Sequence, residues 1–185
     1  MIYNRKCDED QTDISHIENI EIVESIKYLG VKITNRRDCF REYKKDCILK
    51  AKQFANMTYS TIAKSCNKIL IGKTYWKSVA MPSFLYSSEI LEYNEEELKI
   101  FQRIDNQVYR AILKLPTYTA SSALRSEIGA SSAKARDIKN KILFVKHALE
   151  VGNNGLVREI FIHNFYEQEN KLIKKIKKIY ENPKH

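Results

Sequence analysis

Side chains that could do metal-assisted chemistry are few in this sequence. Two neighbouring carboxylates can hold a pair of metal ions that activate a hydroxyl group and stabilise a leaving group. The chain has no adjacent Asp-Asp pair, and its nearest imitation is Asp8-Glu9-Asp10 in a polar segment without a flanking strand. We interpret this cluster as solvated surface.

The remaining candidates for chemistry are equally sparse. The segment 71–74 (Ile-Gly-Lys-Thr) ends like a phosphate-binding loop, but it lacks the first glycine and the preceding strand. None of the four histidines pairs with a cysteine at the spacing of zinc ligands; they are His16, His147, His163 and His185. The sequence therefore predicts no catalytic residue, metal ligand or cofactor within this chain.

Basic side chains near aromatic ones are better candidates for a binding surface. Arg36 and Arg37 precede a predicted helix, and Arg41, Lys45 and Lys52 fall on one side of it, away from its apolar positions. Cations in a row along a helix can contact successive phosphates of a nucleic acid. The alternative is an ordinary solvated helix face.

Two further segments leave alternatives open. Tyr75 and Trp76 could stack on a base, or they could be core residues, as their helical spacing suggests. The segment 171–180 has five lysines on an amphipathic pattern. It could bind RNA, an acidic membrane surface or the groove of a calmodulin-like partner, or it could be an exposed helix.

The net charge of +9 is unevenly distributed. Residues 1–35 hold four basic and seven acidic side chains, giving −3, whereas the other 150 residues hold 28 basic and 16 acidic, giving +12. Such a bias attracts polyanions, whose counterions are released when Lys and Arg neutralise phosphates. An RNA or DNA partner is therefore expected, with a merely basic protein as the alternative.

Cysteine usage and hydropathy predict an intracellular protein of the nucleus or cytoplasm. Four dispersed cysteines without a preceding signal peptide argue against disulfides. The longest uncharged runs, 53–63 and 78–88, are too short for a membrane-spanning helix, which needs about 20 apolar residues.

The apolar spacing predicts a mainly α fold with a short N-terminal β-hairpin. We expect a strand over 1–5, a loop over 6–15, and two β segments on either side of Glu24-Ser25. Gly30 interrupts the alternation and predicts a bulge or a close backbone approach.

Helices are expected over most of the remaining chain. Asp38 is the predicted N-cap of the first helix, Pro82 is expected to kink or end the second, and Asn94 is expected to cap the third. A stripe of Ala135, Ile138, Ile142, Val145 and Leu149 predicts the apolar face of a later helix. The expected helical ranges are 38–65, 67–80, 94–115, 122–128, 135–149, 156–165 and 172–180.

Four short motifs resemble the rear part of LINE-type (non-LTR) retrotransposon reverse transcriptases. Tyr28-Leu29-Gly30-Val31 is similar to the segment that closes the palm of these enzymes, and 38–55 to the opening helix of the thumb. The segment 78–89 matches a Pro-x-x-Leu-Tyr-x-x-Glu motif, except that Ser87 stands where many relatives have Gly. The segment 115–129 resembles the linker downstream of the thumb.

The resemblance implies that the chain is a fragment of an RNA-directed DNA polymerase. The hairpin would be the primer grip, with Lys27, Tyr28, Leu29 and Gly30 in it, and the helices would pack along a template–primer duplex. A glycine at position 30 suits a primer grip, because a residue without Cβ lets a nucleic-acid backbone approach. The alternative is that Tyr28 and Leu29 are strand core and Gly30 is a bulge. The catalytic aspartates and their Mg²⁺ would lie upstream, outside this chain.

The expected regions are a palm remnant with the hairpin (1–35), a thumb-like helical domain (36–115) and a linker with C-terminal helices (116–185). The leading hypothesis is residual binding of an RNA/DNA template–primer duplex without polymerisation. The alternatives are a helical protein-interaction module retained by a host and a basic tail acting at membranes.

Overall fold

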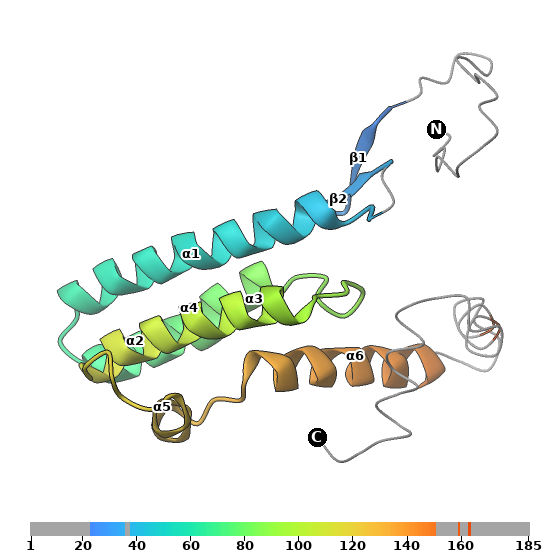
Figure 1. Cartoon of the computed structure of the whole chain (residues 1–185). Helices are drawn as coiled ribbons and strands as arrows, with labels where there is room; N and C mark the ends of the chain where they lie inside the picture. The colour runs from blue at the N-terminus through green and yellow to red at the C-terminus, as the bar shows by residue number, and fades with distance from the viewer. Residues whose placement is uncertain (1–22, 36–37, 151–158, 160–162, 164–185) are drawn as a thin grey trace.

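The fold is mainly helical, with one short antiparallel hairpin ahead of the helices, as the sequence predicts (Figure 1). The computed structural model describes residues 23–35, 38–150, 159 and 163. Its elements are β1 (Ser25–Tyr28), β2 (Val31–Thr34), α1 (Arg41–Lys64), α2 (Lys68–Tyr75), the π-helical turn η1 (Trp76–Ala80), α3 (Met81–Phe84), α4 (Glu95–Leu113), α5 (Ser121–Ile128) and α6 (Ala133–Glu150).

The hairpin turns at Leu29-Gly30, inside the segment after Glu24-Ser25 that the sequence predicts to be one β segment, and Gly30 lies in this turn and not in a bulge. Ser25 pairs with Thr34 and Tyr28 with Val31, which leaves two residues for the turn. Leu29 has a φ of 46° and Gly30 a φ of 85°. Positive φ at both central residues is what a type I′ turn requires, and such turns match the natural twist of paired strands.

Helix α1 follows its predicted course but starts later than expected. Its N-cap is Phe40, which has no side chain to cap the helix. Asp38 instead accepts a hydrogen bond from the Phe40 amide (3.3 Å) and pairs with Lys44 Nζ (2.8 Å). The predicted apolar face is turned toward the core: Tyr43, Cys47, Ala51, Ala55 and Ile62 are buried.

Pro82 does not end the second helical segment, so of the two predicted outcomes, a kink or an end, the end is wrong. The chain stays helical from α2 through η1 and α3 to Phe84, with one π-helical turn directly before the proline. The wider turn is closed by the Met81 amide, which donates to the carbonyl of Trp76. In an α-helix the proline ring would clash with the carbonyl four residues earlier, and the π turn relieves this clash.

Helix α4 begins as the sequence predicts. The Asn94 side chain accepts from the Glu97 amide (2.7 Å), and the Glu97 carboxylate accepts from the Asn94 amide (2.8 Å), which makes a complete capping box. Gly129 ends α5 in the left-handed conformation, also as expected. The predicted stripe of α4 is buried up to Ile112, whereas Leu115 lies beyond the helix end and is exposed.

Helix α6 contacts the other helices mostly through polar groups, so its predicted apolar stripe is wrong apart from Val145. The buried residues of α6 are Ala133, Asp137, Lys141, Val145 and Ala148. Arg136 donates to Asp105 of α4, and Asn140 donates to Ser88 Oγ (2.8 Å). A hydrophobicity pattern misses such a face, because paired charges replace apolar side chains there.

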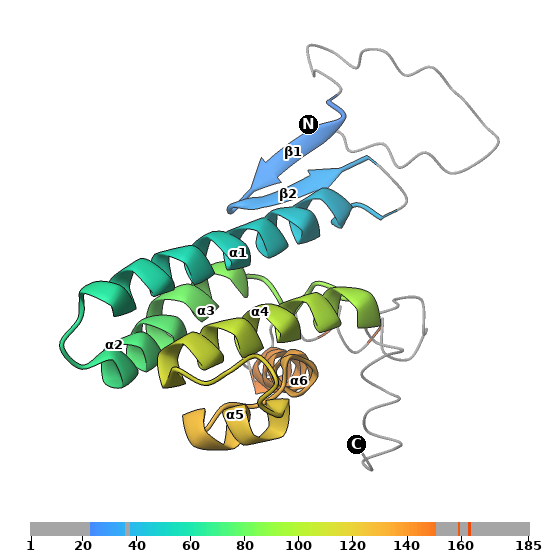
Figure 2. The ribbon, with the colours of Figure 1, turned by 60° about the vertical axis from the view of Figure 1, so that its left-hand side comes forward.

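Helices α1 and α4 and the α2–η1–α3 segment lie side by side (Figure 2), and an aromatic cluster is part of the core that they share. Phe84 stacks on Phe101 with ring centroids 5.7 Å apart, and Tyr93 meets Phe101 edge-on at 5.2 Å. Trp76 lies 5.6 Å from Phe84 and is fully buried. Val31 of β2 belongs to this same core, so the hairpin is packed onto the helices.

Several predictions fall on residues outside those the structure describes. They are the strand over 1–5, the loop over 6–15, the β segment before residue 23, the helices over 156–165 and 172–180, and the lysine-rich segment 171–180. The division into three regions stays a prediction. None of the helices in the described ranges combines the length and apolarity needed to cross a lipid bilayer.

Candidate nucleic-acid interface

Two tyrosines fix the hairpin against the helices. The Tyr86 hydroxyl donates to the carbonyl of Leu29 at the hairpin turn (3.1 Å), and the Tyr43 hydroxyl donates to the carbonyl of Tyr86 (3.4 Å). These contacts link β1, α1 and the segment after α3. The hairpin tip is therefore held in a fixed place relative to α1.

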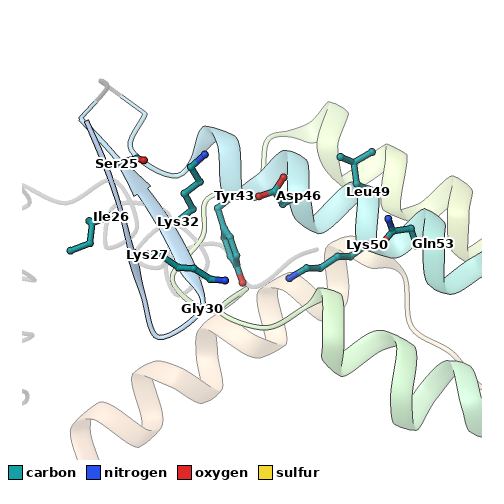
Figure 3. A pocket seen from close by; sticks show the side chains of 10 residues that line it. All are labelled: Ser25, Ile26, Lys27, Gly30, Lys32, Tyr43, Asp46, Leu49, Lys50 and Gln53. Carbon is teal, nitrogen blue, oxygen red and sulfur yellow. The ribbon is translucent and has the colours of Figure 1, made fainter. Parts of the chain in front are cut away.

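The hairpin and α1 enclose a surface hollow of about 580 Å³ (Figure 3). Three lysines and one carboxylate, that of Asp46, are among its ten lining residues, so its lining is net positive. The lining residues are Ser25, Ile26, Lys27, Gly30, Lys32, Tyr43, Asp46, Leu49, Lys50 and Gln53.

The three lysines of the hollow differ in their partners. Lys32 pairs with Glu42 at 2.7 Å. Lys27 and Lys50 are exposed, and neither has a carboxylate within 4.0 Å among the described residues. Figure 3 shows both side chains extending toward the hydroxyl end of Tyr43, one from β1 and one from α1. Two ammonium groups that form no ion pair with a described residue thus converge on one hollow.

Tyr43 gives the hollow a neutral wall. Its ring is buried, and burial raises the pKa of its hydroxyl to about 12. The phenol therefore stays protonated at neutral pH and acts as a hydrogen-bond donor. Lys50 Nζ lies 5.9 Å from the centre of the Tyr43 ring, within the range of a cation–π contact. This contact helps to orient the Lys50 side chain toward the hollow.

The predicted cations of α1 form a row beside the hollow. Arg41, Lys45 and Lys52 are exposed and have no ion-pair partner among the described residues. Leu49 lines the hollow, and its spacing from Arg41, Lys45 and Lys52 places it in the same row on the helix. The row therefore borders the hollow. Arg36 and Arg37 lie outside the described residues.

The predicted grip residues divide between the hollow and the tip of the hairpin. Lys27 and Gly30 line the hollow. Tyr28 and Leu29 are 62% and 72% exposed, so both side chains lie on the surface. Neither is strand core, which was the alternative for these two residues.

Sequence reasoning missed Lys50 and Tyr43 as site residues. Tyr43 belongs to the apolar stripe of α1, and Lys50 lies on a different side of the helix from the predicted row. Only the position of the hairpin over α1 shows that they line a hollow, and that position depends on contacts distant in sequence, such as the one from Tyr86 to Leu29.

Other candidates from the sequence have structural roles. Trp76 is fully buried and donates its ring N–H to Asp105 Oδ1 (3.2 Å), so its face is not available to a base. Gly72 of the segment 71–74 lies inside α2, where an added Cβ would come within 2.9 Å of Ile62 and Ile112. This glycine permits close packing of α2. In the described part of the chain, no three His, Cys, Asp or Glu side chains gather as metal ligands.

Comparison with known proteins gives no relative for this chain. No family model, curated protein or solved structure matches it.

Proposed function

We propose that the chain binds the backbone of a nucleic-acid duplex through the hollow between the hairpin and α1 and through the adjoining row Arg41, Lys45 and Lys52. The observation that carries this proposal is the convergence of Lys27 and Lys50 on the hollow, with no carboxylate of the described residues within 4.0 Å of either ammonium group. Phosphate is the anion that a basic protein of this kind most readily neutralises, and backbone contacts position a duplex without reading its sequence.

The dimensions of the row suit this ligand. Arg41 and Lys52 are eleven residues apart, which is about 16 Å along a helix. Phosphates of one strand follow each other at about 3.4 Å along a duplex axis, so the row could run past about five of them. The hairpin tip, with Tyr28 and Leu29 exposed, would then reach the same duplex from one side.

The proposal extends to the parent family. We infer that the chain corresponds to the primer grip and thumb of a LINE-type reverse transcriptase, without the catalytic aspartates. Ser87 supports this inference: it has a φ of 63°, a conformation that favours glycine, at the position where many of those enzymes have glycine. The residual activity would be clamping of an RNA/DNA template–primer, while Mg²⁺ chemistry belongs to the intact parent.

Salt dependence of binding tests the proposal. We expect the affinity for an RNA/DNA duplex to fall steeply with salt, and the slope of log K against log salt to shrink by roughly 2 in a Lys27→Gln, Lys50→Gln double variant, close to 0.9 per lost phosphate contact. Lys139→Gln is the matched control, because Lys139 is an exposed lysine on α6, outside this surface. Equal slopes in all three proteins would contradict the proposal.

A second candidate function is a protein-interaction module, favoured by one specific surface. Ile69, Leu70 and Ile71 of α2 are 52%, 60% and 38% exposed and adjacent in sequence. Apolar side chains exposed together are typical of protein interfaces. Binding through them would respond little to salt, so the same titration distinguishes the two functions: an affinity that is flat in salt and lost in Leu70→Ser favours the protein partner.

A further inference from the structure

A second basic surface lies on α4 and the loop that follows it. Between residues 98 and 126 the chain has five basic side chains and one acidic side chain, Asp105. Asp105 is buried and paired with Arg136, so it does not offset the charge of the surface. Lys99 is paired with Glu96 (3.5 Å), so it adds no unpaired charge there. Figures 1 and 2 both show the α4–α5 loop at the end of the molecule away from the hairpin. This surface is therefore separate from the hollow.

The outer side of α4 arranges these cations in a row. Arg103, Gln107, Arg110 and Lys114 follow each other at spacings of four, three and four residues, which places them on one side of the helix. Arg103 and Lys114 are exposed and have no ion-pair partner among the described residues. About 16 Å of helix separates them, comparable to about five stacked nucleotides of one strand.

The row ends at Tyr118, which is 88% exposed. The loop that carries Tyr118 is held by several hydrogen bonds. Arg110 donates to the carbonyl of Thr119 (3.1 Å), the Thr119 amide donates to the carbonyl of Pro116 (3.1 Å), and Asn106 donates to Ser121 Oγ (3.0 Å). The tyrosine ring is thus presented to solvent from a fixed loop, with no packing role of its own.

Lys114 lies at the C-terminal end of α4, in a backbone conformation that favours glycine. It follows the last residue of α4 with a φ of 54°, in the left-handed conformation that glycine adopts most easily at a helix end. A side chain there costs about 1–2 kcal/mol in backbone strain. The Lys114 side chain is exposed and forms no hydrogen bond or ion pair with the described residues, so its ammonium group is open to a ligand from solvent.

We propose that this surface binds single-stranded nucleic acid, with a base stacked on Tyr118 and phosphates contacting Arg103 and Lys114. An exposed aromatic ring next to a row of cations is the arrangement that single strands recognise, because every base has a face to stack and every nucleotide a phosphate. A duplex does not offer unpaired base faces. The surface therefore complements the proposed duplex site and does not depend on it.

Photochemical crosslinking and affinity measurements on the full chain test this inference. The probe is an oligouridine of about 12 nucleotides that carries 5-iodouracil. We expect a crosslink at Tyr118. We also expect Tyr118→Ala to weaken binding of the unmodified strand at least about fivefold, while Tyr118→Phe, which keeps the ring, stays close to the unmodified chain.

The variants separate this site from the duplex site. Arg103→Gln with Lys114→Gln should reduce the salt slope for the single strand by roughly 1.4, at about 0.7 per contact, while Lys139→Gln leaves the slope unchanged. The duplex-site variant Lys27→Gln, Lys50→Gln should bind the single strand normally. The inference is overturned if crosslinks fall elsewhere in the chain, or if Tyr118→Ala and Tyr118→Phe bind alike.

Discussion

Leu29 is the residue whose conformation and exposure are hardest to explain by stability alone. It has a φ of 46° and is 72% exposed, so its side chain neither favours the turn nor packs against the core. Asn-Gly is the favoured pair for such a turn, because Asn tolerates positive φ. If the proposed function holds, the exposed Leu29 side chain at the tip of the hairpin, next to the hollow, would contact the duplex.

Leu29→Asn should therefore stabilise the protein and weaken its binding. We expect the free energy of unfolding to rise by about 0.5–1 kcal/mol, because strain at positive φ is relieved. We expect the affinity for an RNA/DNA duplex to fall about two- to fivefold, because an apolar contact is lost. Urea denaturation and fluorescence anisotropy measure the two effects.

Leu29→Ala is the matched control for this experiment. It removes the apolar side chain but leaves a Cβ at positive φ, so binding should weaken without a gain in stability. Unchanged affinity in both variants would mean that the hairpin tip does not contact the nucleic acid.

Single residues also show how far the sequence predicts the site. Helical spacing predicts that Arg41, Lys45 and Lys52 lie on one exposed side of α1, and all three are exposed in the structure. Lys27 and Gly30 were candidates because of a resemblance, and they line the hollow. Lys50 and Tyr43 could not be predicted, since their role depends on a hairpin that contacts α1 through residues more than forty positions away.

At the scale of elements, α6 is held to α4 by charge. Asp105 is almost fully buried; it accepts a hydrogen bond from Trp76 (3.2 Å) and pairs with Arg136. Burial raises the pKa of the Asp105 carboxyl, and the Arg136 guanidinium opposes that shift. Removing one partner of a buried pair leaves the other charge uncompensated in the core, which costs more than the pair itself contributes.

We therefore expect Arg136→Ala to destabilise the protein by about 3–5 kcal/mol at pH 7. Without the guanidinium the pKa of Asp105 rises further in the folded state, so folding of the variant favours the protonated carboxyl. The deficit relative to the unmodified chain should then be largest at neutral pH and shrink as the pH falls toward 4. Urea denaturation at several pH values measures it.

A second substitution checks the cause of that loss. Asp105→Asn combined with Arg136→Ala removes the charge and keeps an oxygen for the Trp76 N–H, so it should recover part of the stability. If the double variant is no more stable than Arg136→Ala, the loss comes from packing of α6 and not from the unpaired carboxylate.

The ends of helices could be predicted where residues adjacent in the sequence determine them. The capping box at Asn94 and the glycine that ends α5 are specified by neighbouring residues, and both are present. The path through Pro82 was not predictable, because the π-helical turn that accommodates the proline has no such local signature. The polar face of α6 was missed for a different reason: its partners, Asp105 and Ser88, lie on other elements.

At the scale of the whole molecule, the hairpin and the helices share one core. The core runs from Val31 of β2 through α1 and α4 to Ile128 of α5, so the hairpin is fixed relative to the cations of α1. Two groups of cations stand out in the described part of the chain: those of the hollow with its bordering row, and those on the outer side of α4. Overall charge predicts a polyanion partner, but only the arrangement of the elements gives two separate surfaces for it.

The most direct test of this account is to map an RNA/DNA duplex of about 16 base pairs onto the protein by backbone amide shifts in an NMR titration. We predict that the shifts concentrate at residues 26–32 of the hairpin and 41–53 of α1, while α5 and the loop before it stay unchanged. Shifts confined to α2 or to the α4–α5 loop, with the hairpin and α1 silent, would contradict the claim that the hollow and its bordering row bind the duplex.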